Sequence, residues 1–303
     1  MTRKYMSIAR MLIFIFPVLI IGCGDGGGTS GGEEFEVDPQ DKENSEEQQT
    51  RVERTEQIFY AIPSPMETVS LLKKAGAEYN KDILNDIENV DNYTSSAKMA
   101  LNLGIYGSDL SYTSVFEQTQ ESMFYTSCAK KLSDNLNISG AFDEATMERM
   151  EQNLEDRDSL LSIISETYWI VDAYLKENDR DITSALLIVG GWVEGLYIAT
   201  QVGTADPSEE LNQRIAEQKL SLENLIGLVN TYEQDEDLTR VLADLKKINA
   251  SFEGVSGGTE ESKVTGEENG VTVIGGSGVS SMSNEQLAKL SETVKTIRDS
   301  YIN

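Results

Sequence analysis

The hydrophobic positions of this chain recur with a helical period over most of residues 65–252. Two segments show it clearly, the first with Leu211, Ile215, Leu222, Leu225 and Val229, the second with Leu238, Val241, Leu245, Ile248 and Phe252. Residues spaced three or four apart share one face of an α-helix, and that face packs against neighbouring helices. No segment between residues 65 and 252 has the two-residue alternation of a strand. The sequence therefore predicts an all-α fold, an antiparallel multi-helix bundle, with its helical domain over residues 58–252.

One segment, Ile182–Val202, is apolar on nearly every side and carries a single charge, Glu194. Such a helix is buried either in a protein core or in a membrane, and its length suits both. A carboxylate in mid-segment is costly in a bilayer, and the flanking segments are amphipathic. We therefore predict a buried central helix. Small residues recur every fourth position (Gly191, Gly195, Ala199 and Gly203) and predict a stripe against which another helix packs closely.

Capping residues predict where the first helices begin and end. Ser64–Glu67 forms a capping box with proline at the first helical position, and Gly76 is expected to end that helix. A second, short helix is predicted from the spacing of Ile83, Ile87 and Val90.

Two glycines predict a break in the next helix, which opens near Thr94. Gly104 or Gly107 should end it, after which Asp109 is expected to cap a further helix. Residues 143–176 are predicted to form one long helix or a helix pair, and Asp181 to cap the central helix.

The N-terminus has the pattern of a bacterial lipoprotein signal. Residues 1–22 combine a basic start with a short apolar run, which ends in Ile20-Ile21-Gly22-Cys23. This ending resembles the lipobox, and the resemblance implies cleavage before Cys23 and lipid attachment to that cysteine. Residues 23–57 are Gly-rich and acidic, which is typical of a flexible tether. Gly24, rather than aspartate, follows the cysteine, and this favours delivery to the outer membrane.

The C-terminal part repeats the combination of linker and helix. Residues 253–283 are rich in Gly, Ser and Glu and are predicted to be a flexible linker, with one short strand at Val271–Ile274. Ser283–Gln286 is a capping box, and residues 284–303 form an amphipathic helix that we expect to dock back on the bundle.

Composition excludes several chemistries. The chain has no histidine, which removes Ser-His-Asp and Cys-His machinery and histidine metal ligation. Its net charge of −27 repels nucleic acid and anionic lipid. With Cys23 assigned to lipid, Cys128 is left alone and is expected to be a small buried residue. The sequence predicts no cofactor and no metal site, and its expected partners are the membrane, through the lipid anchor, and an envelope protein.

Two groups of residues are candidates for a pocket. In the first, Tyr106, Asp109 and Tyr112 lie beside the predicted helix break, either as a cap with two packed tyrosines or as a polar pocket wall. In the second, Trp169 and Trp192 approach Glu194 if the helix of Trp169 packs on the small-residue stripe. Glu194 is then either paired, with Arg157 or Arg180 as candidate partners, or available as a binding or acid–base carboxylate.

Two sequence segments carry a family resemblance. Phe59–Glu67 with Lys73–Gly76, and Leu103–Tyr112, resemble a set of uncharacterised lipoproteins from Bacteroidota-type envelopes, roughly over residues 58–252. The resemblance implies an envelope location and carries no activity with it.

Three functions follow from these patterns. A lipid-anchored binding or protein-interaction module is favoured over an enzyme because the usual catalytic sets are missing. The alternatives are an envelope enzyme that uses Asp109, Glu194 and tyrosine chemistry, and a structural protein that oligomerises through residues 284–303. If the protein is such an enzyme, the carboxyl groups of Asp109 and Glu194 should meet in one open cleft.

Overall fold

The computed structural model describes residues 65–74, 76–141, 143–232, 235–255, 263–268, 271–275 and 281–303. These residues belong to one compact unit, Glu46–Asn303. The predicted signal peptide, Cys23, the tether and the predicted start of the helical domain at residues 58–64 lie outside the described residues, as does Ser64 of the first capping box.

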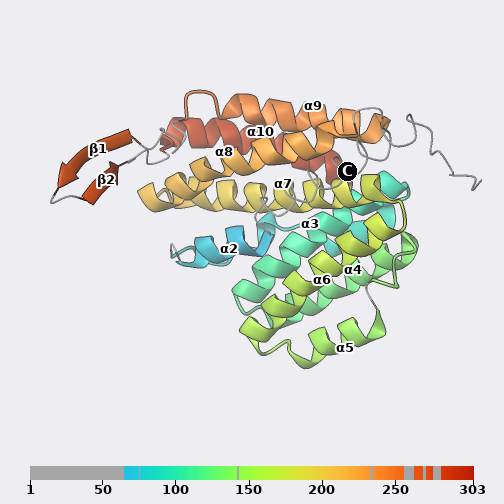
Figure 1. Ribbon diagram of the computed structural model, residues 1–303. Coiled ribbons are helices and arrows are strands. Elements are labelled where there is room, and N and C mark those ends of the chain that lie inside the picture. Colours follow the sequence, from blue (N-terminus) through green and yellow to red (C-terminus); the bar gives the residue numbers. More distant parts are fainter. Residues whose placement is uncertain are drawn as a thin grey trace, which may run out of the picture. The chain divides into compact units, whose positions relative to one another are not determined.

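Helices account for most of the described residues (Figure 1). They are α2 (Pro65–Lys74), η1 (Lys81–Ile83), η2 (Ile87–Asn92), α3 (Ser96–Val115), α4 (Thr119–Asn135), α5 (Glu144–Gln152), α6 (Arg157–Glu177), α7 (Asp181–Ala205), α8 (Glu209–Asn230), α9 (Glu236–Ser251) and α10 (Asn284–Ile302). This confirms the predicted all-α multi-helix bundle.

A single hairpin lies within the predicted C-terminal linker, as far as the structure describes that segment. Strands β1 (Lys263–Glu268) and β2 (Val271–Gly275) pair antiparallel, with a bulge between Val264 and Gly266. The strand predicted at Val271–Ile274 is therefore confirmed, and its partner β1 was not predicted.

Helix α7 is the core of the bundle. Figure 1 shows it between one layer of α8, α9 and α10 and another of α3, α4 and α6. It contacts α2, α3, α6, α8, α9 and α10. Among the described helices it alone is long and apolar enough to cross a membrane, yet 89% of its most apolar window is buried inside the protein. The apolar surface is thus covered by the other helices, as predicted for a buried central helix.

Helix α3 runs unbroken through both glycines, so the predicted break at Gly104 or Gly107 is wrong. A Cβ at Gly104 would overlap the carbonyl oxygen of Leu187 and lie 2.6 Å from the amide nitrogen of Gly191. Gly190 makes the reciprocal approach to the backbone of Leu101. The missing side chains let the α3 and α7 backbones touch, and this packing outweighs the low helix propensity of glycine.

The close approach corrects the predicted packing stripe as well. The closest approach is made by Gly190, which precedes the predicted stripe, and by the backbone of Gly191 at its start, and the facing helix there is α3 and not the helix of Trp169. Farther along α7, Gly203 faces side chains of Ile215 in α8 and Leu287 in α10.

Several predicted helix boundaries change by a few residues. Residues 143–176 form the helix pair α5 and α6, capped by Asp143 and Asp156. The predicted short helix is replaced by the 3₁₀ turns η1 and η2. Helix α3 is capped by Ser95, next to the expected Thr94. Asp181 is the first residue of α7 and does not cap it, since Arg180 holds the cap position.

The C-terminal helix α10 docks on the bundle, as predicted. Its capping box, formed by Ser283 and Gln286, is present. It packs on α7, α9 and α3. The predicted apolar face is buried, with Leu287, Leu290, Val294, Ile297 and Tyr301.

Candidate functional site

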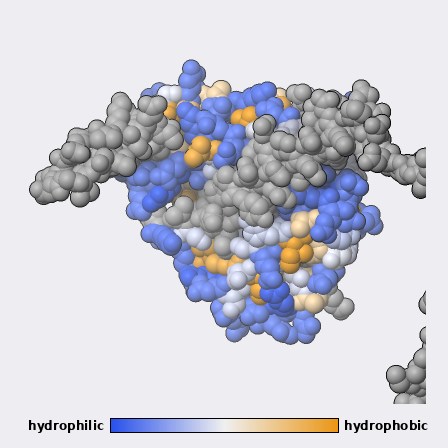
Figure 2. All heavy atoms as spheres, viewed as in Figure 1, coloured by the Kyte–Doolittle hydropathy of each residue, from blue (hydrophilic) through white to orange (hydrophobic). Residues whose placement is uncertain are grey.

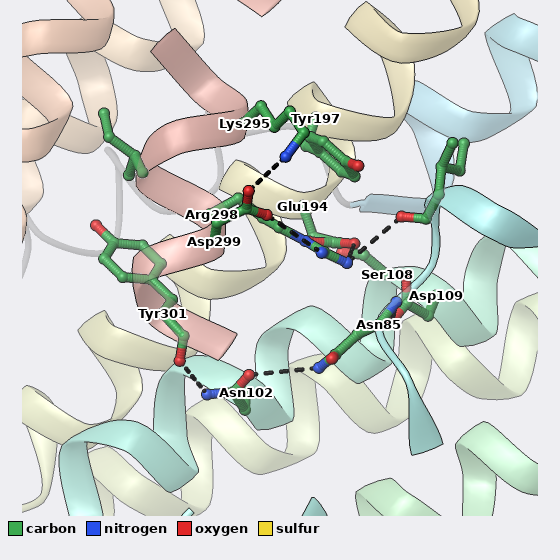
Figure 3. Close-up of polar contacts among 12 residues, drawn as sticks. Asn85, Asn102, Ser108, Asp109, Glu194, Tyr197, Lys295, Arg298, Asp299 and Tyr301 are labelled. Carbon is green, nitrogen blue, oxygen red and sulfur yellow. Dashed lines mark hydrogen bonds and ion pairs between the residues drawn. The ribbon is translucent and has the colours of Figure 1, made fainter. Parts of the chain in front are cut away.

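A buried ion pair joins the central helix to the C-terminal helix. The Arg298 guanidinium of α10 donates to both carboxylate oxygens of Glu194 in α7, at 2.8 and 2.9 Å (Figure 3). The Glu194 side chain is fully buried and that of Arg298 is 5% exposed. Burial lowers the pKa of Arg298, and the ion pair with Glu194 outweighs this and raises it above its usual value. The Arg298 guanidinium therefore stays charged.

The partners predicted for Glu194 are wrong. Arg157 begins α6 at the surface, where it pairs with Asp158. Arg180 donates to the backbone oxygen of Leu136 at 2.8 Å. Sequence reasoning missed Arg298 because it lies 104 residues from Glu194. The available signal was an arginine inside the apolar seam of α10, next to Ile297, where an unpaired charge would be costly.

Asp109 lies beside this ion pair, in the middle of α3, so its predicted role as a helix cap is wrong. Its side chain is fully buried, and one oxygen accepts the amide hydrogen of Asn85 at 3.3 Å. Burial raises the pKa of Asp109 well above its usual value, and repulsion from Glu194 raises it further. Arg298 has the opposite effect but does not reverse the shift.

A protonated Asp109 resolves the hydrogen bonding of the cluster. Its second oxygen, Oδ1, has no donor among the described residues. A side-chain hydrogen bond with Glu194 also raises the pKa of Asp109, and the neutral acid is the form of Asp109 that can donate it.

Amide side chains extend the cluster along α10 and the loop before η2. Asn85 donates to the Tyr93 hydroxyl at 3.0 Å. Asn102 donates to the backbone oxygen of Tyr301 at 2.9 Å (Figure 3). The guanidinium of Arg298 lies 4.6 Å from the ring centre of Tyr197. These contacts hold the end of the chain against α3 and α7.

The two candidate tyrosines of α3 are packed in the core. The Tyr106 hydroxyl donates to the backbone oxygen of Asp86 at 2.8 Å, and that of Tyr112 accepts the amide hydrogen of Asn80 at 3.0 Å. Burial raises the pKa of both hydroxyls. Both tyrosines hold the segment around η1 and η2 on α3 and stay protonated at neutral pH.

The two tryptophans lie apart from these polar contacts. Trp169 of α6 packs edge-to-face on Tyr168, with ring centres 6.3 Å apart. Trp192 of α7 is buried, and its Nε1 has no acceptor among the described residues. The charged contacts of Glu194 come from α3 and α10, so the structure brings together Asp109 and Glu194 but does not add Trp169 to them.

A separate cavity of about 70 Å³ lies between α3, α4, α5, α6 and α7. Its wall is almost entirely apolar, with Leu103, Leu110, Met150, Ile164, Val171 and Leu187 among its residues. No charged side chain lines it. None of the six candidate pocket residues contributes to this wall.

The arrangement leaves little chemistry for catalysis. Asp109 and Glu194 do meet, but both are fully buried and no cleft opens to them in the part of the chain that is described. Cys128 is buried as predicted, and burial raises the pKa of its thiol to about 11, so it is a poor nucleophile. No cluster of three or more acidic or cysteine side chains suited to a metal ion occurs among the described residues.

No protein-family model, curated protein or solved structure matches this chain. Function is therefore inferred from the buried cluster, the apolar cavity and the N-terminal sequence.

Proposed function

We propose that the protein is a lipid-anchored lipoprotein of the outer membrane whose helical body is a binding module and not an enzyme. The anchor rests on the sequence Ile20-Ile21-Gly22-Cys23 behind a basic, then apolar, N-terminus. Residues 24–56 join it to the body, with a root-mean-square reach of about 30 Å for a flexible chain of this length. The body is thereby free to meet partners near the membrane surface.

The observation that carries the non-catalytic role is the closure of the charged cluster. Acid–base catalysis needs a titratable group within hydrogen-bond reach of a substrate. Asp109 and Glu194 are fully buried, and their hydrogen bonds go to Arg298, Asn85 and each other. The cluster is best explained as the contact that holds α10 in place. An apolar cavity between α3, α4, α5, α6 and α7 is a concave feature suited to a ligand.

Docking of α10 disfavours the alternative in which the protein is structural and oligomerises through residues 284–303. Its apolar face is buried against α7 and α9 of the same chain. Pairing with a second chain through that face would first require α10 to leave the bundle and to break the Glu194–Arg298 ion pair. Deleting residues 284–303 and measuring mass in solution tests this: a change from oligomer to monomer would support the structural role.

The anchor is tested by replacing Cys23 with serine and following incorporation of a labelled fatty acid in the producing cell. Cys23→Ser should abolish labelling and release the protein from membranes. Cys128→Ser is the matched control, because it removes the other cysteine of the chain, which is buried in the bundle. Labelling that persists in Cys23→Ser, or that is lost in Cys128→Ser, contradicts the proposed anchor.

The binding role is tested by recovering the anchored protein from its native envelope after mild crosslinking. Stable, saturable partners or ligands should accompany the full chain. The alternative of an enzyme is tested by comparing turnover by the native protein and by Glu194→Gln. If the native protein has an activity that a folded Glu194→Gln variant lacks, the non-catalytic assignment is overturned.

A further inference from the structure

We propose that the apolar cavity between α3, α4, α5, α6 and α7 is a binding site for a small neutral amphiphile, a short aliphatic group that carries one oxygen acceptor. This inference rests on the proposed function and gives the binding module a ligand class. Two features of the cavity wall carry it, Ser133 and Gly107, and neither has a structural role in the described part of the protein.

Ser133 presents an unused hydroxyl to the cavity. Its side chain lines the cavity and is 1% exposed, and its Oγ has no hydrogen-bond partner among the described residues. Two other hydroxyls in this wall are satisfied within their own helices, that of Ser111 by the backbone oxygen of Gly107 and that of Thr167 by the backbone oxygen of Ile163. A buried polar group without a partner is costly, so a ligand oxygen that accepts from Ser133 would remove a penalty as it binds.

Gly107 keeps the cavity open. A Cβ at this position would meet nothing within 4 Å, whereas one at Gly104, a turn earlier, would overlap the α7 backbone. Gly104 is thus required for packing, but Gly107 is not. Glycine inside a helix is unfavourable relative to alanine, and here it is placed on the cavity wall. The space that a side chain would fill is space for a ligand.

Charge and size define the ligand. No acidic or basic side chain lines the cavity, so a carboxylate or an ammonium group would enter without a counterion, at high cost. Its volume of about 70 Å³ is about half that of a 150 Å³ cavity known to hold benzene, which leaves room for roughly three or four carbon atoms. A larger molecule would insert only the end of its chain. Figure 2 shows apolar residues at the surface in the lower half of the view, where α4, α5 and α6 lie in Figure 1.

The probe for this site is n-butanol, and the protein is the full-length chain in a lipid nanodisc, with an empty nanodisc as the blank. Binding is followed by the NMR shifts of methyl groups in the cavity, such as those of Leu103 and Ile164. We expect saturable binding, tighter by about fourfold for each methylene added from ethanol to n-butanol. Butyrate and butylammonium, which have the same chain but a charge, should not bind.

Matched variants separate the hydroxyl from the cavity. Ser133→Ala should weaken n-butanol binding by about three- to tenfold, the usual effect of one hydrogen bond. Ser111→Ala is the control, since it removes an already bonded hydroxyl from the same wall. Gly107→Val should abolish binding by filling the space, and Gly107→Ala, which adds a single methyl group, should weaken it while the far-UV circular dichroism spectrum stays that of the native fold.

Four results would overturn the inference: no saturable binding of n-butanol, equal binding by Ser133→Ala and Ser111→Ala, unchanged binding by a folded Gly107→Ala and Gly107→Val pair, or tighter binding of butyrate. Any of these would leave the lipid anchor untouched, because that is tested separately at Cys23. Conversely, if the Cys23→Ser test fails, the same alkanol titration is made on the full chain without a nanodisc, because the cavity lies within the helical bundle.

Discussion

Replacing Arg298 with methionine should destabilise the protein strongly. Methionine preserves most of the length and the apolar stem of arginine and removes only the guanidinium. Glu194, which is fully buried beside Asp109, would then lose both of its hydrogen bonds to Arg298 and its ion-pair partner. The contact of the guanidinium with the Tyr197 ring is also lost.

The size of the effect follows from this burial. Breaking a buried ion pair by removing one partner typically costs about 3–5 kcal/mol, because the other charge stays in the interior without compensation. A typical protein has only about 5–15 kcal/mol of net stability, so the variant should lose a large part of it. Removing both charges together, in Glu194→Leu with Arg298→Met, should restore stability to near the native value, since nothing charged is then left without a partner.

The assay is urea denaturation of the full chain, followed by far-UV circular dichroism, with hydrogen exchange of α10 as a second readout. Arg240→Met is the matched control, because its ion pair with Asp237 lies at the surface, where the Arg240 side chain is 76% exposed. That variant should show no measurable loss. The reasoning is refuted if Arg298→Met loses no more stability than Arg240→Met, or if the double variant is as unstable as Arg298→Met alone.

Three further predictions concern α3. Asp109→Asn should be nearly neutral below about pH 4, where the carboxyl is protonated in both the folded and the unfolded chain, and should become stabilising as pH rises, because the carboxyl then ionises more readily in the unfolded chain. Because the pKa of Asp109 is raised in the folded chain, its protonated carboxyl contributes to the free energy of unfolding. This contribution is complete below the unfolded pKa of about 4. It decreases by up to about 1.4 kcal/mol per pH unit as pH rises, and is lost once pH passes the folded pKa. The free energies of unfolding of the native protein and of Asp109→Asn are measured by urea denaturation across pH. The native value minus the variant value should fall as pH rises. A difference that does not change with pH would show that Asp109 is ionised in the folded protein. Gly104→Ala should cost about 1–3 kcal/mol or more, since its Cβ would overlap Leu187. Gly107→Ala, whose Cβ meets nothing, should instead stabilise the protein by about 0.5–1 kcal/mol, and equal thermal melting temperatures for the two alanine variants would contradict the packing described.

Much of the fold followed from local patterns. Helical periodicity and caps such as Asp143 and Ser283 act within one or two turns of the chain, so their positions are determined by nearby residues. The apolar surface of the segment around Glu194 likewise required burial, whatever covered it. Docking of the last helix followed from its apolar seam.

The candidate site depended on residues that are far apart in the chain. Nothing near Glu194 identifies Arg298 as its partner, because only the packing of α10 on α7 brings them together. The helix break expected at Gly104 failed for a related reason, since propensity is a local quantity and close contact with α7 outweighed it. With the helix intact, Asp109 became a buried mid-helix residue instead of a cap.

The sequence by itself thus determined which segments are helical and where their apolar faces lie, because these depend on neighbouring residues. Tertiary structure alone decided that Asp109, Glu194 and Arg298 share one buried site and that Ser133 and Gly107 line one cavity. The physical reason is that desolvation, charge pairing and empty volume belong to the packed assembly of helices, and no single stretch of the chain possesses them.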